Sequence, residues 1–294
     1  MLLFDFSDKS IKVLKLSARL LGGNEISGFA KGDLKPGLIE NSEVRDPDAL
    51  AKEVQKVLKK ASPKSLTDQE AAFVLHDERS FNLRLTSPVT EDIKIAPDLL
   101  EKQLVSILPV PISTVVYDAW DRQFAAVDQK IFSQYLDLFG KLGLKPQLAV
   151  PESQAVWAFL SSQIGEGEVG AFLDIGAEAT DVVLLDRAGV LQTFTEPIET
   201  AQLTRGMGEV SSFSQSKFGK APVKIFLGGG GALSLDVKKF SEETKIPVIS
   251  GGEVLKTYSI QISVNFGQTS KLGFVSLFGL ALLTRQKSPL NFVR

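Results

Sequence analysis

The chain has 294 residues, of which 44% are hydrophobic, which is enough for one large domain or two ordinary ones. Basic and acidic residues nearly balance, at 33 and 35, and no run of Lys or Arg alternates with aromatic residues, so the composition argues against a nucleic-acid partner. The absence of cysteine and the single histidine, His76, exclude disulfides and cysteine-ligated zinc and argue against a Ser-His-Asp triad.

Two segments of the chain resemble each other. LLFDFSDKSIKVLKL begins at Leu2 and AFLDIGAEATDVVLL begins at Ala171, and each predicts a strand that ends in Asp, a short turn and a second strand. The same offset separates Asp5 from Asp174 and Lys12 from Asp181. A further strand is expected after each hairpin, at Glu25–Leu34 and Val190–Pro197.

One hairpin of this kind could arise by chance, because Asp and Gly suit turns. Two such hairpins, each followed by a third strand and helix-rich sequence, favour a duplicated α/β fold. We expect the carboxylate turns of the two halves to face each other across a cleft that can hold a metal bound to phosphates.

A helix is predicted at Asp46–Ala61, with Asp46 as its N-cap and Pro47 at its first position. Leu50, Val54 and Leu58 form its apolar stripe. Strand Ala71–His76 follows, and His76 is expected to be solvated or structural, without a chemical role.

The next segment predicts a small α+β module inserted into the first half. Its expected elements are strand Phe81–Thr86, helix Pro97–Leu108, strands Ser113–Trp120 and Arg122–Asp128 paired with each other, and helix Lys130–Leu142. Strand Gln147–Val150 and helix Glu152–Ile164 then return to the first half.

In the second half, one helix, Thr200–Phe218, fits before strand Val223–Leu227. Gly228–Gly231 follow, and we expect helix Ala232–Thr244 to begin directly after them. A strand, a glycine run and a helix N-terminus together suit a phosphate or nucleoside, although glycine runs also form ordinary tight turns. No Lys-Ser/Thr pair follows, so the run is not a Walker loop, and the first turn, Ser7–Ser10, lacks the glycines of a Rossmann site.

A last strand is expected at Pro247–Ser250 and a last helix at Gly273–Thr284. The longest apolar stretch, Phe274–Leu283, is shorter than the roughly 20 residues of a membrane span. Met1–Asp5 has no basic segment before an apolar core, so we expect no signal peptide. These features predict a cytoplasmic protein that reaches a membrane only through a partner.

These residues resemble a known family. The two hairpins are similar to the phosphate motifs of actin-like ATPases, KIFLGGGGAL is similar to their adenosine motif, and VPESQAVWAFL and LGFVSLFGLAL resemble their hinge helices. Further segments, including GDLKPGLIENSEVRDPDALAKEVQKVL, LPVPISTVVYDAWD and TFTEPIETAQLTRGM, resemble the PilM family of type IV pilus assembly proteins. The resemblance covers essentially the whole chain.

The resemblance implies an actin-like, ribonuclease H-like α/β fold of two similar halves with a small SHS2-like insert. The expected parts are a first half at 1–78, the insert at 79–145, a return with a hinge helix at 146–165, a second half at 166–272, and a second hinge helix and tail at 273–294.

The resemblance also implies a site for ATP with Mg²⁺. Asp5 and Asp174 would hold the metal through water, and Glu152 would lie near the metal or the attacking water as the candidate catalytic residue. The other site residues would be Ser7, Asp8 and Ser10 in one phosphate loop, Gly176, Ala177 and Thr180 in the other, and Gly228, Gly229, Gly230 and Gly231 at the adenosine. A structural alternative stays open for the acidic residues: Asp5 and Asp174 would only end their strands, and Glu152 would only cap its helix.

Two departures from the family predict weak, vestigial ATP binding and negligible turnover. Ser7 stands where the family usually has Gly, which narrows the approach of phosphates to the backbone. Residues 198–222 leave room for one helix where PilM relatives carry several, so the chain resembles a shortened form without most of the adenine-covering subdomain. Hydrolysis needs a closed, preorganised site.

By the resemblance, the protein is a scaffold of type IV pilus or related secretion assembly at the inner membrane. It would bind the cytoplasmic tail of a PilN-like membrane protein, with an Asn-Leu-Leu-Pro-like core, in a groove around Phe81–Thr86 and Leu99–Val110. Segment Pro289–Arg294 resembles that tail, and either docks in its own or a neighbour's groove or is a disordered end.

Two other functions of the same superfamily stay open. An FtsA-like division scaffold would need an amphipathic membrane-targeting tail. A sugar-kinase-like phosphotransferase would need an acceptor pocket with a catalytic base.

Overall fold

The computed structural model describes residues 1–19, 23–89, 108–176, 179–196, 202–266, 271–286 and 290–293. Its contacts divide the chain into two compact units. The first unit comprises Met1–Glu152, Gln261–Val264 and Leu280–Arg294, and the second comprises Ser153–Ile260 and Asn265–Gly279.

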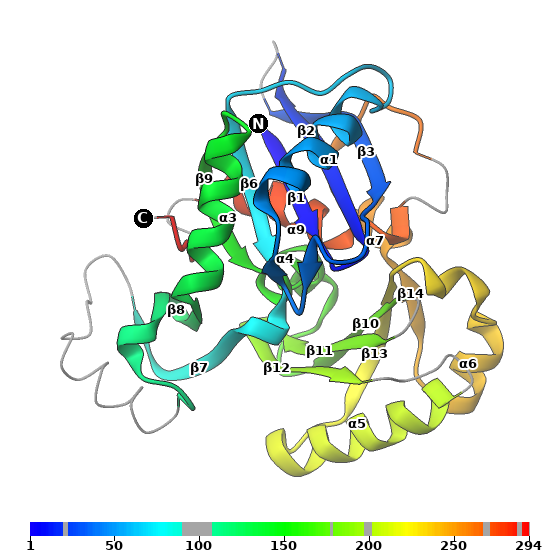
Figure 1. The fold of residues 1–294 in the computed structure, drawn as a ribbon. Helices are drawn as coiled ribbons and strands as arrows, with labels where there is room; N and C mark the ends of the chain where they lie inside the picture. The colour runs from blue at the N-terminus through cyan, green and yellow to red at the C-terminus, as the bar shows by residue number, and fades with distance from the viewer. Residues whose placement is uncertain are drawn as a thin grey trace. The chain divides into compact units, whose positions relative to one another are not determined.

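The first unit contains a six-stranded sheet with the order β15-β3-β2-β1-β6-β9. The strands are β1 (Leu2–Phe6), β2 (Ser10–Ala18), β3 (Asn24–Asp33), β6 (Glu70–Leu75), β9 (Lys145–Pro151) and β15 (Gln261–Ile262) (Figure 1). β1, β2 and β3 form an antiparallel meander, and β6 and β9 continue the sheet parallel to β1. The predicted opening meander is therefore confirmed.

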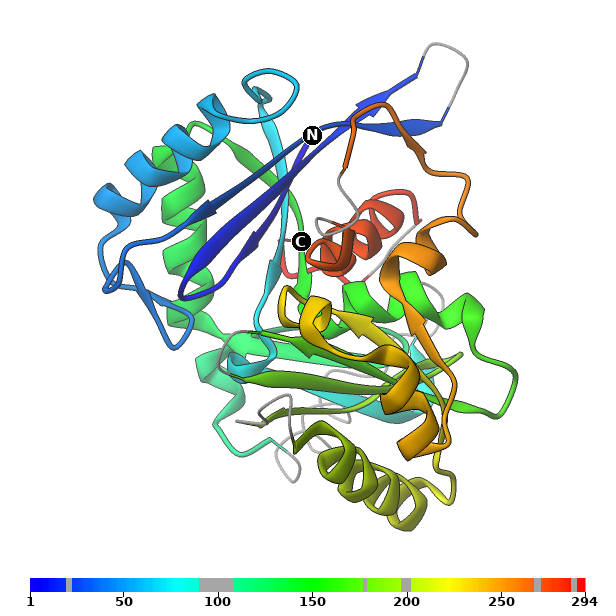
Figure 2. The same ribbon diagram turned by 90° about the vertical axis from the view of Figure 1, so that its right-hand side faces the viewer.

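Two helices, α1 (Pro47–Lys59) and α3 (Gln129–Lys141), cover one face of this sheet (Figure 2). The Asp46 carboxylate accepts a hydrogen bond from the Ala49 N–H, so the predicted N-cap of α1 is confirmed. Val57 completes the buried face of α1, and Leu58 is only partly buried. Leu50, Val54 and Val57 have the i, i+4, i+7 spacing of one helix face. The face of α3 adds to an aromatic cluster of Phe4, Phe6, Phe73, Phe132, Tyr135 and Phe139.

Two small sheets complete the first unit. β4 (Ile39–Glu40) pairs with β5 (Glu43–Val44), and β7 (Ser80–Val89) pairs antiparallel with β8 (Val115–Asp128). A 3₁₀ turn, η1 (Asp77–Arg79), joins β6 to β7, and η2 (Ile112–Thr114) precedes β8.

The predicted pairing of Ser113–Trp120 with Arg122–Asp128 is wrong, because Val115–Trp120 and Arg122–Asp128 both belong to the single strand β8, and Ser113 lies in η2. Asp121 adopts φ of 53° inside β8, where it makes an irregularity in the pairing with β7 and does not reverse the chain. The predicted helix Pro97–Leu108 lies outside the described residues except for Leu108.

The second unit repeats the strand connections of the first. Its sheet has the order β12-β11-β10-β13-β14, with β10 (Val169–Ile175), β11 (Thr180–Asp186), β12 (Gly189–Glu196), β13 (Pro222–Gly228) and β14 (Val248–Ser250). The first three strands form an antiparallel meander, and β13 and β14 run parallel to β10. The similarity between the segments that begin at Leu2 and Ala171 therefore corresponds to a repeated topology.

Helices α5 (Leu203–Phe218) and α6 (Val237–Thr244) pack on this second sheet. Leu203 and Met207 of α5 and Phe240 of α6 join a buried cluster with side chains of β10, β11 and β13. In the described part between β12 and β13, α5 is the one helix, as the short spacing predicts.

Three further helices are α4 (Glu152–Leu160), α7 (Gly251–Leu255) and α9 (Val275–Leu283), and η3 (Ser161–Gln163) extends α4. A Cβ atom on Gly279 would lie 1.7 Å from the Ala155 carbonyl oxygen, so α9 and α4 approach each other at a position that only glycine permits. Among the described residues, none of the helices has the length and apolar character needed to cross a bilayer.

Candidate functional site

The first hairpin carries an internal ion pair. Asp5 is 1% exposed, and its register partner on β2 is Lys12. The Lys12 ammonium lies 3.0 Å from the Asp5 carboxylate oxygen Oδ2. A buried carboxylate needs a counter-charge or donors to offset its lost hydration, and Lys12 supplies that charge at the position where the resemblance expects a metal.

The turn after Asp5 is closed by its own serines. The Ser7 backbone N–H donates to the Ser10 carbonyl at 2.8 Å, and the Ser10 N–H donates to Ser7 Oγ at 3.0 Å. The two hydroxyls also lie 3.0 Å apart. A phosphate loop presents backbone N–H groups to its ligand, whereas here both of these N–H groups bond within the turn.

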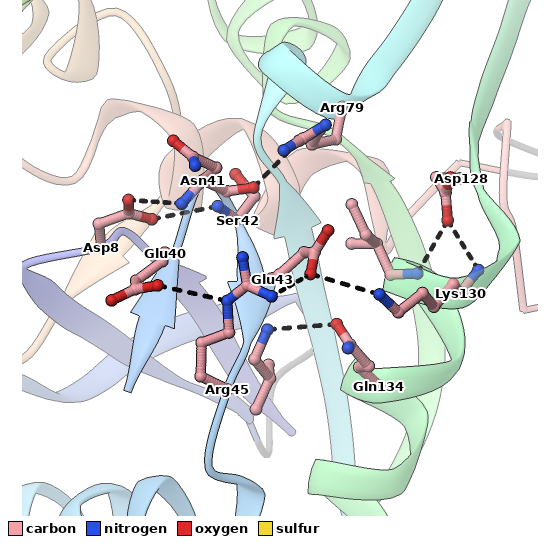
Figure 3. A network of polar contacts seen from close by, with 12 residues as sticks. Asp8, Glu40, Asn41, Ser42, Glu43, Arg45, Arg79, Asp128, Lys130 and Gln134 are labelled. Carbon is pink, nitrogen blue, oxygen red and sulfur yellow. Dashed lines mark hydrogen bonds and ion pairs between the residues drawn. The ribbon is translucent and has the colours of Figure 1, made fainter. Parts of the chain in front are cut away.

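Asp8 holds a neighbouring turn in place (Figure 3). Its carboxylate accepts hydrogen bonds from the backbone N–H groups of Asn41, at 2.8 Å, and Ser42, at 3.1 Å. These two residues adopt φ of 50° and 64° in the tight turn between β4 and β5. Asp8 therefore stabilises backbone in a left-handed conformation, a structural role that the sequence did not suggest.

Tyr135 of α3 completes this corner of the first unit. Its hydroxyl donates to the Ser42 carbonyl at 3.3 Å. Burial raises the pKa of Tyr135 far above its usual value, and the negative charges of Asp8 and Asp5 raise it further. The phenol therefore stays neutral and serves as a hydrogen-bond donor throughout the physiological range.

Glu152 contacts His76, a residue that was expected to have no chemical role. Nδ1 of His76 lies 3.5 Å from Glu152 Oε2. His76 follows β6 and Glu152 follows β9, and the last residues of these parallel strands, Leu75 and Pro151, are register partners. The strand order, which brings the two chain segments side by side, is the signal that would have predicted this contact.

Glu152 is also the first residue of α4. A carboxylate in the first turn of a helix interacts favourably with the helix dipole. Both predicted interpretations of Glu152, a helix-terminus carboxylate and a member of a nucleotide site, are compatible with this position.

In the second unit, the glycine run packs directly against the second hairpin. Gly228 is the register partner of Asp174 on the adjacent parallel strand. A Cβ atom on Gly229 would lie 2.3 Å from Asp174 Oδ1 and 2.3 Å from the Ile175 carbonyl oxygen. One on Gly231 would lie 2.7 Å from the Gly176 carbonyl oxygen. The structure thus brings Asp174, Gly176 and the glycines together.

The predicted helix Ala232–Thr244 is wrong in its first part. Gly231 begins a four-residue 3₁₀ turn, η5 (Gly231–Ser234), and α6 begins only at Val237, after Asp236 as its N-cap. Asp236 starts a new helix because its side chain accepts from the Lys239 N–H. The N-terminus of a long helix therefore does not follow the glycine run.

The second hairpin differs from the first in its charge. Asp181 occupies the position across from Asp174 that Lys12 occupies across from Asp5. Its carboxylate accepts a hydrogen bond from the Thr195 hydroxyl at 2.7 Å. Thr180 is fully buried, and Ala177 lies outside the described residues.

The residues present fit Mg²⁺-ATP poorly. In the first unit Asp5 pairs with Lys12, Ser7 and Ser10 bond to each other, and Asp8 bonds to backbone. Within the described ranges no group of three His, Cys, Asp or Glu side chains could hold a metal ion. Asp5 and Asp174 belong to different units, so their predicted sharing of one metal site stays a prediction.

No protein-family model matches the sequence, and no curated protein matches it significantly. Solved structures do match. One, a PilM-PilN type IV pilus biogenesis complex, superposes with a TM-score of 0.78 at 18% identity, over 96% of this chain and 97% of that chain. Another, from Bacteroides thetaiotaomicron, is described as having an actin-like ATPase fold and unknown function, with a TM-score of 0.53 at 11% identity, over 95% and 94% of the two chains. The chain has the actin-like ATPase fold.

A third structure, the ethanolamine utilization protein EutJ from Carboxydothermus hydrogenoformans, matches with a TM-score of 0.53 at 13% identity, over 96% of this chain and 88% of that one. These comparisons confirm the predicted fold class, and they confirm the predicted resemblance to PilM at the level of the fold. The meander and parallel strands that recur in the two units correspond to the two similar halves of this fold.

Proposed function

We propose that this actin-like protein is a cytoplasmic scaffold of type IV pilus assembly or a related secretion system. It binds the cytoplasmic tail of a PilN-like inner-membrane protein and reaches the membrane through that partner. The observation that supports the proposal most strongly is the similarity to PilM in a PilM-PilN complex over 96% of the chain.

We further propose that ATP binding is weak and hydrolysis negligible. The first hairpin supports this, because Lys12 already neutralises the buried Asp5 carboxylate and the turn bonds to itself. Binding a magnesium-phosphate group there would first require breaking these contacts. The protein then acts by binding other proteins, and the contact between Glu152 and His76 has a structural role.

Fluorescence anisotropy with a labelled peptide tests the partner. The probe is a synthetic N-terminal segment of a PilN-like protein with an Asn-Leu-Leu-Pro core, and its matched control carries Asn→Ala. We expect saturable binding of the first peptide by the full chain and at least about tenfold weaker binding of the control. Equal binding of both peptides, or binding of neither, contradicts the proposal.

Calorimetry with Mg²⁺-ATP tests the nucleotide claim. We expect little or no heat of binding and no phosphate release above background. We also expect Glu152→Gln to leave that background unchanged. A micromolar dissociation constant, or release that Glu152→Gln abolishes, would instead assign the protein to the active ATPases.

A further inference from the structure

A short segment near the end of the sequence lies along the edge of the first sheet. Within the described part of the chain, β9 pairs with β6 on one side only. Such an edge presents backbone N–H and C=O groups to any strand that can pair with it. Segment 290–293 occupies this edge (Figure 1). The Phe292 N–H donates to the Ala149 carbonyl at 3.0 Å.

The Asn291 side chain recognises the backbone of β9 with both of its polar atoms. Its Oδ1 accepts from the Ala149 N–H at 3.0 Å, and its Nδ2 donates to the Gln147 carbonyl at 3.0 Å. Asparagine offers a donor and an acceptor on two separate atoms at this reach: aspartate lacks the donor, glutamine is one carbon longer, and a serine or threonine hydroxyl has a single oxygen for both. The edge of β9 therefore selects an asparagine.

Residues on either side of Asn291 are held as well. Leu290 is 5% exposed and Phe292 is 3% exposed. The Phe292 ring packs edge-to-face on Phe132 of α3, with centroids 6.1 Å apart. The site therefore takes an apolar residue before the asparagine and an apolar or aromatic one after it.

The β7–β8 sheet contributes the remaining contact. The Asn291 backbone N–H donates to Asp118 Oδ2 of β8 at 2.7 Å. This charge-assisted bond fixes the backbone of the bound segment. Three elements that follow one another in the chain, β8, α3 and β9, thus converge on segment 290–293, which is distant from them in the sequence.

We propose that this surface is a peptide-binding site specific for an asparagine between apolar residues, and that the protein's own Leu290–Val293 occupies it in cis. The site takes the asparagine-containing tail of the membrane partner in trans only after the segment leaves. This inference rests on the proposed function, because both peptides share an asparagine next to leucine. Segment 290–293 is then autoinhibitory: it occupies the site and lowers the apparent affinity for the partner.

A tethered segment competes at an effective concentration in the millimolar range. The partner's apparent affinity is therefore reduced by the fraction of molecules in which the segment is docked. Weakening the docked segment should raise that affinity without any change in the surface that binds the partner.

The test uses the full chain with Asn291→Ala, and with Val293→Ala as the matched control, because Val293 contributes a backbone bond that the substitution keeps. The probe is a labelled peptide with the sequence of residues 286–294, QKSPLNFVR. We expect Asn291→Ala to bind it about tenfold or more tightly than the wild type does, and Val293→Ala to match the wild type. A probe with Asn→Ala should bind none of them.

A second variant guards against misfolding of the first. Asn291→Asp keeps the size of the side chain, but it replaces the donor to Gln147 by a carboxylate oxygen and adds a negative charge. It should therefore increase probe binding in the same direction. Circular dichroism of each variant must match the wild type. Equal probe binding by the wild type and both correctly folded Asn291 variants, or binding by none, would overturn the inference.

The same proteins separate this inference from the proposed function. If the PilN-like peptide binds the wild type and Asn291→Ala equally, the scaffold function stands and occupancy in cis is wrong. If Asn291→Ala binds QKSPLNFVR but not the PilN-like peptide, the asparagine site stands and the proposed partner is wrong.

Discussion

Gly229 offers a direct test of the packing between the glycine run and the second hairpin. It adopts φ of +83°, and an added Cβ would overlap two oxygen atoms, Asp174 Oδ1 and the Ile175 carbonyl, each at 2.3 Å. A left-handed alanine costs about 1–2 kcal/mol, and overpacking a tight site costs about 1–3 kcal/mol more. Gly229→Ala should therefore destabilise the protein by about 2–5 kcal/mol.

The neighbouring glycine supplies the control. Gly230 has φ of −72° and ψ of −30°, and a Cβ there would meet nothing within 4 Å. Gly230→Ala should be neutral or stabilise the protein by up to about 1 kcal/mol, because it restricts the unfolded chain. Urea unfolding followed by circular dichroism compares the two variants. Equal midpoints would refute the packing argument and leave the run as a flexible loop.

Three further substitutions test the local contacts. Asp8→Ala removes the acceptor of two backbone N–H groups and should lower the free energy of unfolding by about 1–3 kcal/mol, measured by urea titration. Ser250→Ala removes the capping box of α7 and should cost about 1 kcal/mol in the same assay. Burial alone would raise the pKa of Asp68, but hydrogen bonds from Lys15 and the Met1 amino group outweigh it and hold that pKa well below its usual range. Since the pKa of Asp68 is lower in the folded state than in the unfolded state, Asp68 stabilises the fold above about pH 4 and loses that contribution on further acidification. Asp68→Asn should therefore destabilise the protein at pH 7 and progressively less at lower pH. An equal effect at pH 7 and pH 2 would contradict this.

Much of the fold follows from local patterns in the sequence. The Asp5 and Asp174 hairpins were predictable because each combines alternating apolar residues with a turn that suits Asp. Helix α1 was predictable because Asp46 and Pro47 mark its start. Pairing between distant strands was less accessible: β8 pairs with β7, and nothing near Asp121 distinguishes a bulge from a reversal of the chain.

The candidate site shows the same division. The sequence placed Asp5 at the end of a buried strand, but the ion pair with Lys12 depends on the register of two strands. The His76–Glu152 contact depends on β6 and β9 being neighbours. The start of α6 at Val237, later than the predicted Ala232, depends on the N-cap at Asp236. Each of these is a property of the folded chain and not of a sequence window.

Binding of the PilN-like peptide with and without saturating Mg²⁺-ATP tests the central claim most directly, because it asks in one titration whether partner binding depends on nucleotide. We predict that the Asn291→Ala full chain, with its cis segment weakened, binds the peptide with a dissociation constant that Mg²⁺-ATP leaves unchanged. No binding, or binding that appears only when Mg²⁺-ATP is present, would contradict the account.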